Sequence, residues 1–452
     1  MAFKTILRLG LCLPLLAQAG QPTDSHQINN HQQLFGAICG GSAATAASEL
    51  QVSAARERLD AAGVDKWLPD VDLSVEAYSA DGEPTSFFAL NSTPEPDAPQ
   101  PDVSASGEVW EGKVNLNWAL YDEGRWVGQS DLGEAQASSE FAVAQSELTR
   151  ARSEALKLAA QYYFDALMYS AQVDLLEPFA SKRKTQLADV EKKLGAGVRT
   201  RVDFYAAKAA YLGINEQLKQ AIRQRDKNIG YLKLLSQTPI TLPTLGEQGG
   251  TAELAQIESL EIALENPEQL VKHQPDVTNL SAKLQLEREK LSASSGKLLP
   301  SLNLFVRGRS AESFDTHEDR QYGEVGLAVE YPLGAVAKNS GESKALRRSV
   351  EAISSELDYL MKVKMLQATQ LSDELASAKN SIEVKAAELA RRNQLLLSDQ
   401  QKLQSGLVGL DALIDSEDDK IQAELNLLGA YRDAWKQYVD TLLFTGQACA
   451  AR

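Results

Sequence analysis

A long unit occurs twice in this chain, and this duplication limits the possible folds more than any other feature of the sequence. Residues 66–73 read KWLPDVDL, and residues 297–304 read KLLPSLNL. Each stretch follows a helix-like segment, at roughly 43–63 and 276–295. Each also opens a run in which apolar and polar residues alternate, which is the period of a strand with two different faces. The chain is therefore predicted to contain two copies of one supersecondary unit.

Each copy has a second predicted strand. Residues 110–120 read WEGKVNLNWAL, in which the apolar positions alternate with Glu, Lys and Asn. The segment between the first two strands is rich in Pro, Asp and Ser, which is typical of a solvated loop, and its counterpart in the second copy is shorter. Strands are predicted over about 70–79, 109–121, 301–308 and 323–333.

The second strand of each copy leads directly into a long helix. Residues 342–405 contain neither Gly nor Pro, and as one helix they would extend about 95 Å. The corresponding helix of the first copy is predicted over about 128–194, with a kink at Pro178. Both helices end at glycines, Gly197 and Gly406. Return helices are predicted over about 201–236 and 411–443.

The N-terminus has the pattern of a secretory signal. Lys4 and Arg8 precede an apolar stretch, and a small-x-small site lies before Gly20. A short membrane anchor is the alternative, but the apolar stretch is too short to span a bilayer. Because no run of about 18 apolar residues follows, a mature chain that crosses a membrane is expected to do so as a closed β-barrel.

Charge and motifs argue against several functions. The chain carries 46 Lys and Arg against 62 Asp and Glu, a net charge of −16, which does not favour nucleic acid or anionic lipid surfaces as partners. Its 4 His residues lack metal-ligand spacing. No nucleophile elbow, phosphate-binding loop or dinucleotide motif is present. We therefore predict no enzyme, no metal and no cofactor, and we expect the acidic run at 417–419 to face solvent.

Two cysteines remain after removal of the signal, Cys39 and Cys449. In an oxidising compartment such widely separated thiols either pair and clamp the two ends of the chain together or stay apart. The sequence leaves both possibilities open.

The predicted strands can also be compared with the strands of membrane β-barrels. Trp110 and Trp118 are both at apolar positions of the alternating pattern in one strand and lie roughly 27 Å apart along it. This is near the spacing of aromatic girdles in outer-membrane barrels. An ordinary hairpin half-buried on a soluble core is the alternative. Four strands are too few to close a barrel, so a barrel requires several copies of the chain.

At this point the sequence resembles the TolC family of outer-membrane efflux and secretion channels. Leu-Pro strand openings at 68–69 and 299–300 carry the resemblance, together with HQPDV at 273–277, LYDEGR at 120–125 and GVRTRVD at 197–203. The resemblance implies a mainly α fold with a transmembrane β part. In it, a homotrimer forms a 12-stranded β-barrel that is continuous with a periplasmic α-helical barrel.

The same resemblance implies a passive exit duct in the cell outer membrane that extends into the periplasm. Its partners would be further copies of itself, outer-membrane lipid, a periplasmic adaptor (membrane fusion protein) and an inner-membrane ABC or RND transporter. Cargo is left open between small toxic molecules and secreted protein. The alternative from another class is a periplasmic helical-hairpin adaptor or scaffold without a membrane barrel.

Domain boundaries follow from the repeats. The chain divides into a signal peptide at 1–19, an N-terminal segment at 20–42, a first repeat at 43–238, an equatorial linker at 239–272, a second repeat at 273–445 and a C-terminal tail at 446–452.

Site residues are implied by the resemblance, position by position. The periplasmic gate would use Arg199, Asp203, Asp411 and Asp415, and adaptor contacts would use Gly197, Thr200, Gly406 and Gly409. Barrel and tunnel would join at Pro69, Gly124, Pro300 and Pro332, with a lipid-facing girdle at Trp110 and Trp118. The second turn departs from the family pattern, since Ala412 stands where Asp is expected. For Asp203 and Asp411, simple stabilisation of a helix N-terminus is the alternative role.

Overall fold

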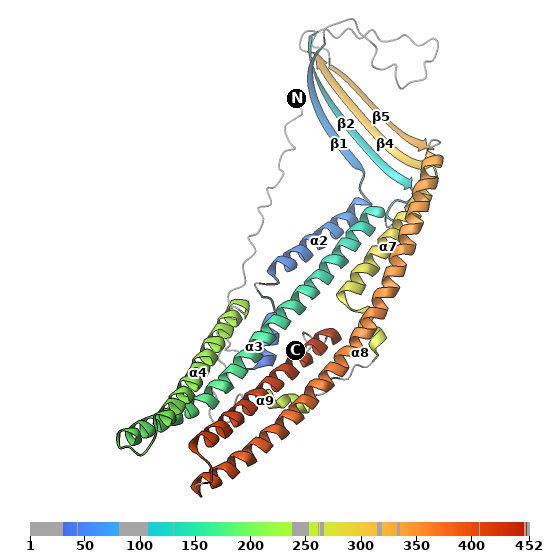
Figure 1. Cartoon of the computed structure of the whole chain (residues 1–452). Helices are drawn as coiled ribbons and strands as arrows, with labels where there is room; N and C mark the ends of the chain where they lie inside the picture. Colours follow the sequence, from blue (N-terminus) through green and yellow to red (C-terminus); the bar gives the residue numbers. More distant parts are fainter. Residues whose placement is uncertain are drawn as a thin grey trace, which may run out of the picture.

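A computed structural model describes residues 30–42, 44–80, 107–129, 131–236, 253–260, 262, 266–313, 319–331, 335–405, 407–446 and 449. The expected signal peptide, most of the first inter-strand loop, Pro332 and Gly406 lie outside these residues. The described chain is elongated, with a sheet at one end and the helical turns at the other (Figure 1).

The element order contains the unit twice. The first copy comprises α2 (Ala46–Asp65), β1 (Asp70–Ala80), β2 (Gly107–Asp122), the short β3 (Arg125–Trp126), α3 (Leu132–Gly195) and α4 (Arg201–Ser236). The second comprises α7 (Pro275–Gly296), β4 (Ser301–Ser313), β5 (Asp319–Glu330), α8 (Ala335–Gln404) and α9 (Leu410–Thr445). The prediction of a mainly helical, duplicated chain with a β part is confirmed.

Three short elements add detail that the sequence did not predict, and Pro178 lies where the sequence placed it, within the first long helix. The elements are α1 (His31–Cys39), η2 (Gln256–Ser259) and α6 (Pro267–Lys272). Pro178 lies inside α3 without ending it. None of the described helices is long and apolar enough to cross a bilayer.

The sheet places apolar residues of all four main strands on one face. Its order is β1-β2-β4-β5, with antiparallel neighbours. One row across it pairs Val71, Leu116, Val306 and Val325 in turn. On the other face Lys113 Nζ lies 2.9 Å from Glu76 Oε2, and Arg307 pairs with Glu324 at 3.2 Å. The alternation of apolar and polar residues in the sequence therefore gives the sheet one apolar and one polar face.

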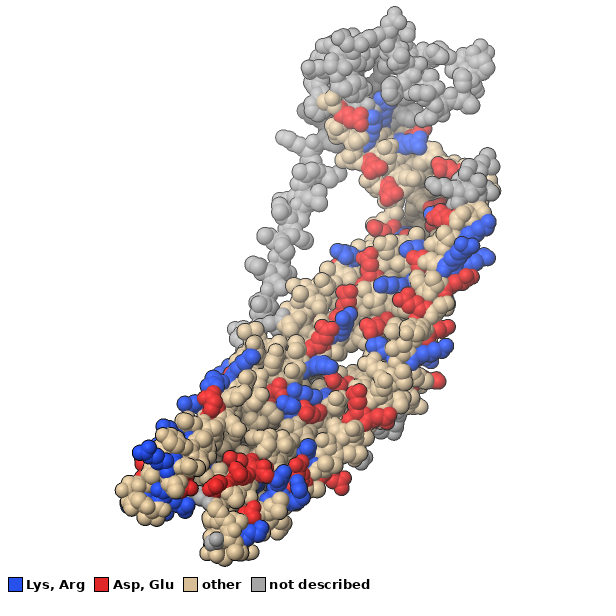
Figure 2. All heavy atoms as spheres, viewed as in Figure 1, with Lys and Arg blue, Asp and Glu red and all other residues tan. Residues whose placement is uncertain are grey.

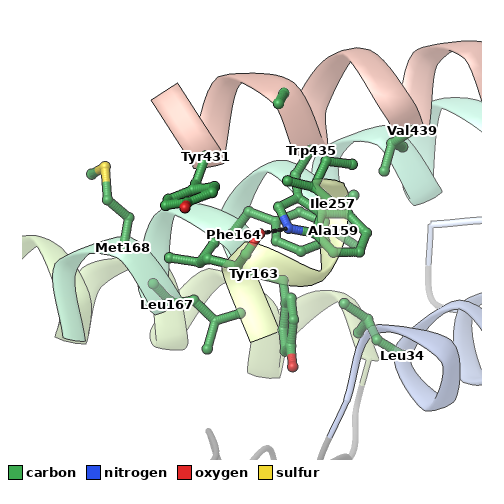
Figure 3. Close-up of a cluster of buried hydrophobic side chains, with 14 of the residues drawn as sticks. Leu34, Ala159, Tyr163, Phe164, Leu167, Met168, Ile257, Tyr431, Trp435 and Val439 are labelled. Carbon is green, nitrogen blue, oxygen red and sulfur yellow. Dashed lines mark hydrogen bonds between the residues drawn. The ribbon is translucent and has the colours of Figure 1, made fainter. Parts of the chain in front are cut away.

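The principal hydrophobic core lies midway along the helices, where α3 and α9 meet. Phe164 of α3 stacks on Trp435 of α9, with ring centroids 4.5 Å apart, and Tyr163 is fully buried beside them (Figure 3). Leu34 of α1 packs into the same cluster. Trp435 Nε1 donates a hydrogen bond of 2.9 Å to the Leu254 carbonyl, so the segment before η2 is held here too.

Candidate functional site

The turn between α3 and α4 closes on a glycine. Gly197 has φ 70°, a left-handed conformation that glycine adopts without a Cβ penalty. This allows the Val198 and Arg199 N–H groups to donate to the Lys193 carbonyl, at 2.9 and 3.3 Å. The Val198 side chain at this turn is 70% exposed.

Thr200 and Asp203 form a reciprocal cap at the start of α4. Asp203 Oδ2 accepts from both the N–H and the hydroxyl of Thr200 at 2.9 Å, and the Asp203 N–H donates to Thr200 Oγ1 at 3.2 Å. These hydrogen bonds from Thr200 lower the pKa of the Asp203 carboxyl. The structure thus places Asp203 on its own helix terminus, which is the helix-stabilising alternative raised from the sequence.

This cap predicts a local pH dependence. Because the folded-state pKa of Asp203 lies below its ordinary value of 3.8, its stabilisation is present above that value and is lost as pH falls through the folded-state pKa. Amide exchange at the start of α4, corrected for its intrinsic pH dependence, should therefore accelerate as pH falls below about 4. Asp203→Asn should remove most of this acid-induced change. An equal change in this variant would contradict the prediction.

The turn between α8 and α9 has similar backbone closure but a different cap. The Leu407 N–H donates to the Lys402 carbonyl at 2.8 Å, and Leu407 is 75% exposed. Gly409 is the N-cap of α9 and supplies no side-chain hydrogen bond. Asp411, in the first turn of α9, has the placement expected of a carboxylate near a helix N-terminus.

An acidic groove separates α4 from α9 near the tip. Asp411 and Asp415 line it, together with Asp418 and Asp419, and its volume is about 550 Å³. The α4 side is formed mostly by small residues, Ala206, Ala209, Ala210 and Gly213, together with Ile214 and Gln217. Figure 2 shows acidic side chains gathered between the two helical tips. The structure therefore brings Asp411 and Asp415 together but keeps Asp203 in its cap.

Arg183 is a site residue that sequence reasoning missed. Its side chain on α3 is 1% exposed. Its Nη2 donates to Asp418 Oδ1 at 2.8 Å and to the Ile414 carbonyl at 3.0 Å, both on α9. The same nitrogen lies 3.3 Å from Glu417 Oε2, and Lys182 also pairs with Glu417. Arg183 thus links α3 to α9 within one chain, and the gate role of Arg199 stays a prediction.

The expectation that the acidic run faces solvent is wrong for Glu417, whose side chain is 2% exposed. Burial raises the pKa of the neighbouring Asp418 carboxyl, while Arg183 opposes that rise. Only the run of charge was visible in the sequence. The helix period alone did not show that Arg183 and Glu417 face each other across an interface.

The junction between strands and helices is tightly packed. Pro69 and Pro300 each precede a strand, and Gly124, with φ 83°, lies in the turn from β2 to β3. A side chain at Gly296, the last residue of α7, would overlap the Glu123 carbonyl oxygen, with its Cβ only 1.8 Å away. The glycine thus permits α7 to approach this turn.

The two girdle tryptophans both lie in β2. Trp118 is half-buried, and its Cα pairs with that of Leu304 on the apolar face of the sheet. Trp110 pairs with Ala77 and Glu312 through the backbone, and its side chain lies outside the described ones. Among the described residues, no group of three or more His, Cys, Asp or Glu is arranged to hold a metal ion.

Comparison with known proteins finds one matching family model and several solved structures with the same fold. Residues 41–235 match the family model of the outer membrane efflux proteins. No curated protein matches the chain. In fold, the chain is similar to CusC, with a TM-score of 0.72, 13% identity, and coverage of 93% of this chain and 92% of that one.

Two further solved structures share the fold at low identity. VceC of Vibrio cholerae has a TM-score of 0.67 and 16% identity, with 92% of this chain and 96% of that chain covered. The open state of the MtrE outer membrane channel of Neisseria gonorrhoeae has a TM-score of 0.69 and 12% identity, with 93% and 89% covered.

Proposed function

We propose that this chain is an outer membrane efflux protein and that three copies of it form a passive exit duct across the outer membrane and periplasm. The match of residues 41–235 to that family model and the fold shared with CusC support this proposal. An inner-membrane transporter of the ABC or RND class would drive export through the duct. A periplasmic adaptor would join the two at the helical tip, where Gly197, Thr200 and Gly409 lie in or flank the turns. The fourth predicted contact, Gly406, lies outside the described residues.

The open sheet is the observation that carries this proposal. β1 and β5 form the two ends of the strand order, and unpaired edges are ready to pair with further strands. Four strands cannot enclose a pore, whereas three copies supply twelve. The apolar face is exposed in the single chain, with Leu73 at 73% and Leu327 at 65%. It would face lipid, and the polar face would line the pore.

Two neighbouring residues of β5 test this assignment of faces. Leu327→Arg would put a charge on the lipid face, at a cost of about 2–4 kcal/mol per copy near the bilayer midplane. Ala328→Arg is the matched control, because residue 328 lies on the opposite face of the same strand. We expect Leu327→Arg to remove most heat-modifiable, detergent-requiring trimers from the outer membrane and Ala328→Arg to retain them. Equal effects of the two variants would contradict the assignment.

The acidic groove suggests which ions the helical tip would favour. In a trimer, Asp411 and Asp415 would repeat around the axis and favour cations over anions. Alanine at both positions should raise conductance in a planar bilayer or reduce cation preference, whereas Asp226→Ala, which removes an exposed carboxylate higher on α4, should change neither. An unchanged conductance and ion preference in the double variant would remove these residues from the gate.

The helical-hairpin adaptor remains the competing proposal. It accounts for paired helices and an acidic surface but gives no role to a four-stranded sheet with one continuous apolar face. A monomer that is stable in water without detergent would favour the adaptor. Trimers that require detergent would favour the channel.

A further inference from the structure

Helix α1 lies as a short cover over the place where the two repeats meet. Leu34 and Ile38 are fully buried, and Phe35 is 7% exposed, in the cluster that contains Phe164 of α3 and Trp435 of α9 (Figure 3). A helix of 9 residues is marginal on its own in water. The position of α1 therefore depends on its packing and on the contacts that hold its two ends.

The first end of α1 is held by a buried polar contact. His31 Nδ1 lies 3.3 Å from Glu253 Oε1, and the Tyr163 hydroxyl donates to the same oxygen at 2.9 Å. The His31 ring also lies 4.9 Å from that of Trp435. These contacts connect α1 to α3, to α9 and to the segment before η2.

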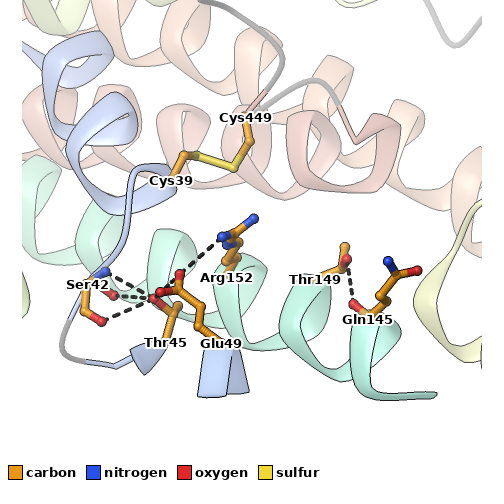
Figure 4. Close-up of polar contacts among 8 residues, drawn as sticks. All are labelled: Cys39, Ser42, Thr45, Glu49, Gln145, Thr149, Arg152 and Cys449. Atoms are coloured by element: carbon orange, nitrogen blue, oxygen red, sulfur yellow. Dashed lines mark hydrogen bonds and ion pairs between the residues drawn. A yellow bond between two sulfur atoms is a disulfide. The ribbon is translucent and has the colours of Figure 1, made fainter. Parts of the chain in front are cut away.

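The last residue of α1 is held covalently. Cys39 is disulfide-bonded to Cys449, with Cα atoms 5.6 Å apart across a sequence separation of 410 residues (Figure 4). Cys449 follows the end of α9, which closes at Gly446 with φ 71°. Cys449 is exposed and Cys39 is half-buried. The bond therefore joins the N-terminal cover to the end of the second repeat, at a place that other proteins can reach.

We propose that Cys39 and Cys449 are a maturation site for a dithiol-oxidising protein of the oxidising compartment, and that the bond it makes clamps α1 over the junction of the repeats. The compartment follows from the proposed function. The oxidant is a disulfide-bearing oxidoreductase. One thiolate attacks its disulfide to give a mixed disulfide, and the second thiolate then attacks the sulfur of the first cysteine and releases the oxidoreductase thiolate. The two thiols lose two protons and two electrons, and the oxidoreductase leaves as a dithiol.

Chain order sets the timing of this step. Cys39 leaves the export machinery early, but its partner follows 410 residues later. The clamp is therefore completed only after those residues have crossed the inner membrane. Until then α1 is held by noncovalent contacts alone.

Hydrogen exchange on the full-length protein in detergent tests the clamp. We expect reduction of the bond to accelerate amide exchange in residues 31–39 by at least about tenfold, because a cross-link limits local opening. Exchange in residues 201–212 of α4, which are distant from the bond, should not change. The Cys39→Ser/Cys449→Ser variant should exchange like the reduced protein, with and without reductant. Equal exchange of α1 in the oxidised and reduced proteins would overturn the clamp.

A second variant keeps the test informative if the serine variant folds poorly. Leu34→Ala weakens the packing of α1 but leaves the disulfide intact, so its effect on α1 exchange should be several-fold larger after reduction than before. Identical effects in both states would show that the bond does not hold α1.

Thiol labelling tests the oxidation step. Protein from ordinary cells should not react with maleimide, whereas protein from cells without the dithiol oxidase should carry two reactive thiols. A small disulfide added to the medium should restore the bond. Two reactive thiols in ordinary cells, or a bond that forms equally without the oxidase, would overturn the maturation site. Pore formation by the reduced protein, measured in parallel, shows whether the proposed function stands independently.

Discussion

Arg183→Ala is expected to be the most damaging single change near the tip. It leaves Glu417, 2% exposed, without its buried cationic partner, and breaking a buried pair in this way costs about 3–5 kcal/mol. Lys182 retains part of the interaction, but its side chain is 49% exposed. The Ile414 carbonyl also loses the side-chain donor that it has in addition to its helical hydrogen bond. Denaturant unfolding in detergent should show the loss of stability.

The functional consequence should appear at the tip as well. Arg183 fixes α9 against α3, so its loss should let α8 and α9 move outward and raise channel leak to small solutes. Arg223→Ala is the matched control, since its pair with Glu216 is exposed at both side chains and is worth less than about 1 kcal/mol.

A paired variant separates lost charge balance from lost packing. Arg183→Met with Glu417→Leu replaces the buried charges by apolar groups, which often restores stability. If this double variant has the wild-type free energy of unfolding but its channel still leaks, then the hydrogen bonds from Arg183 to Ile414 and Asp418 are what keep the tip closed. Wild-type stability and leak in Arg183→Ala would contradict the role assigned to this residue.

Trp435→Ala is expected to destabilise the middle of the molecule by about 3–5 kcal/mol. Trp435 is fully buried, stacks on Phe164 and donates to the Leu254 carbonyl. Trp435→Phe keeps most of the packing and loses the hydrogen bond, so its cost should be nearer 1–3 kcal/mol.

Exposed Trp126 supplies the control for this experiment. Its side chain is 58% exposed, and Trp126→Ala should cost much less in the same denaturant titration. A cost of Trp435→Ala no larger than that of Trp126→Ala would show that the α3 and α9 contact is not the principal core.

The sequence predicted those features that repeat with a regular period. Alternation located the strands, and the absence of Gly and Pro from residues 342–405 indicated the second long helix, which runs from Ala335 to Gln404. Proline and glycine marked the element ends because they restrict or free the backbone locally. The capping alternative for Asp203 was likewise visible from its spacing to Thr200.

Contacts between distant segments could not be predicted in the same way. The nine residues of α1 have no repeat partner, and their burial depends on a surface built by α3 and α9. The α9 partners of Arg183 lie more than 200 positions away in sequence, as the separations of 231 and 235 residues show. The disulfide was one of two possibilities, because cysteine spacing alone does not show which thiols meet.

Single-channel recording in planar bilayers tests the central claim most directly. Purified trimers of the wild-type chain should insert and give discrete, long-lived conductance steps with a preference for cations, and Leu327→Arg should not give them. Absence of any channel activity from correctly folded wild-type protein, or its recovery as a water-soluble monomer, would contradict the claim that this chain forms an outer-membrane duct.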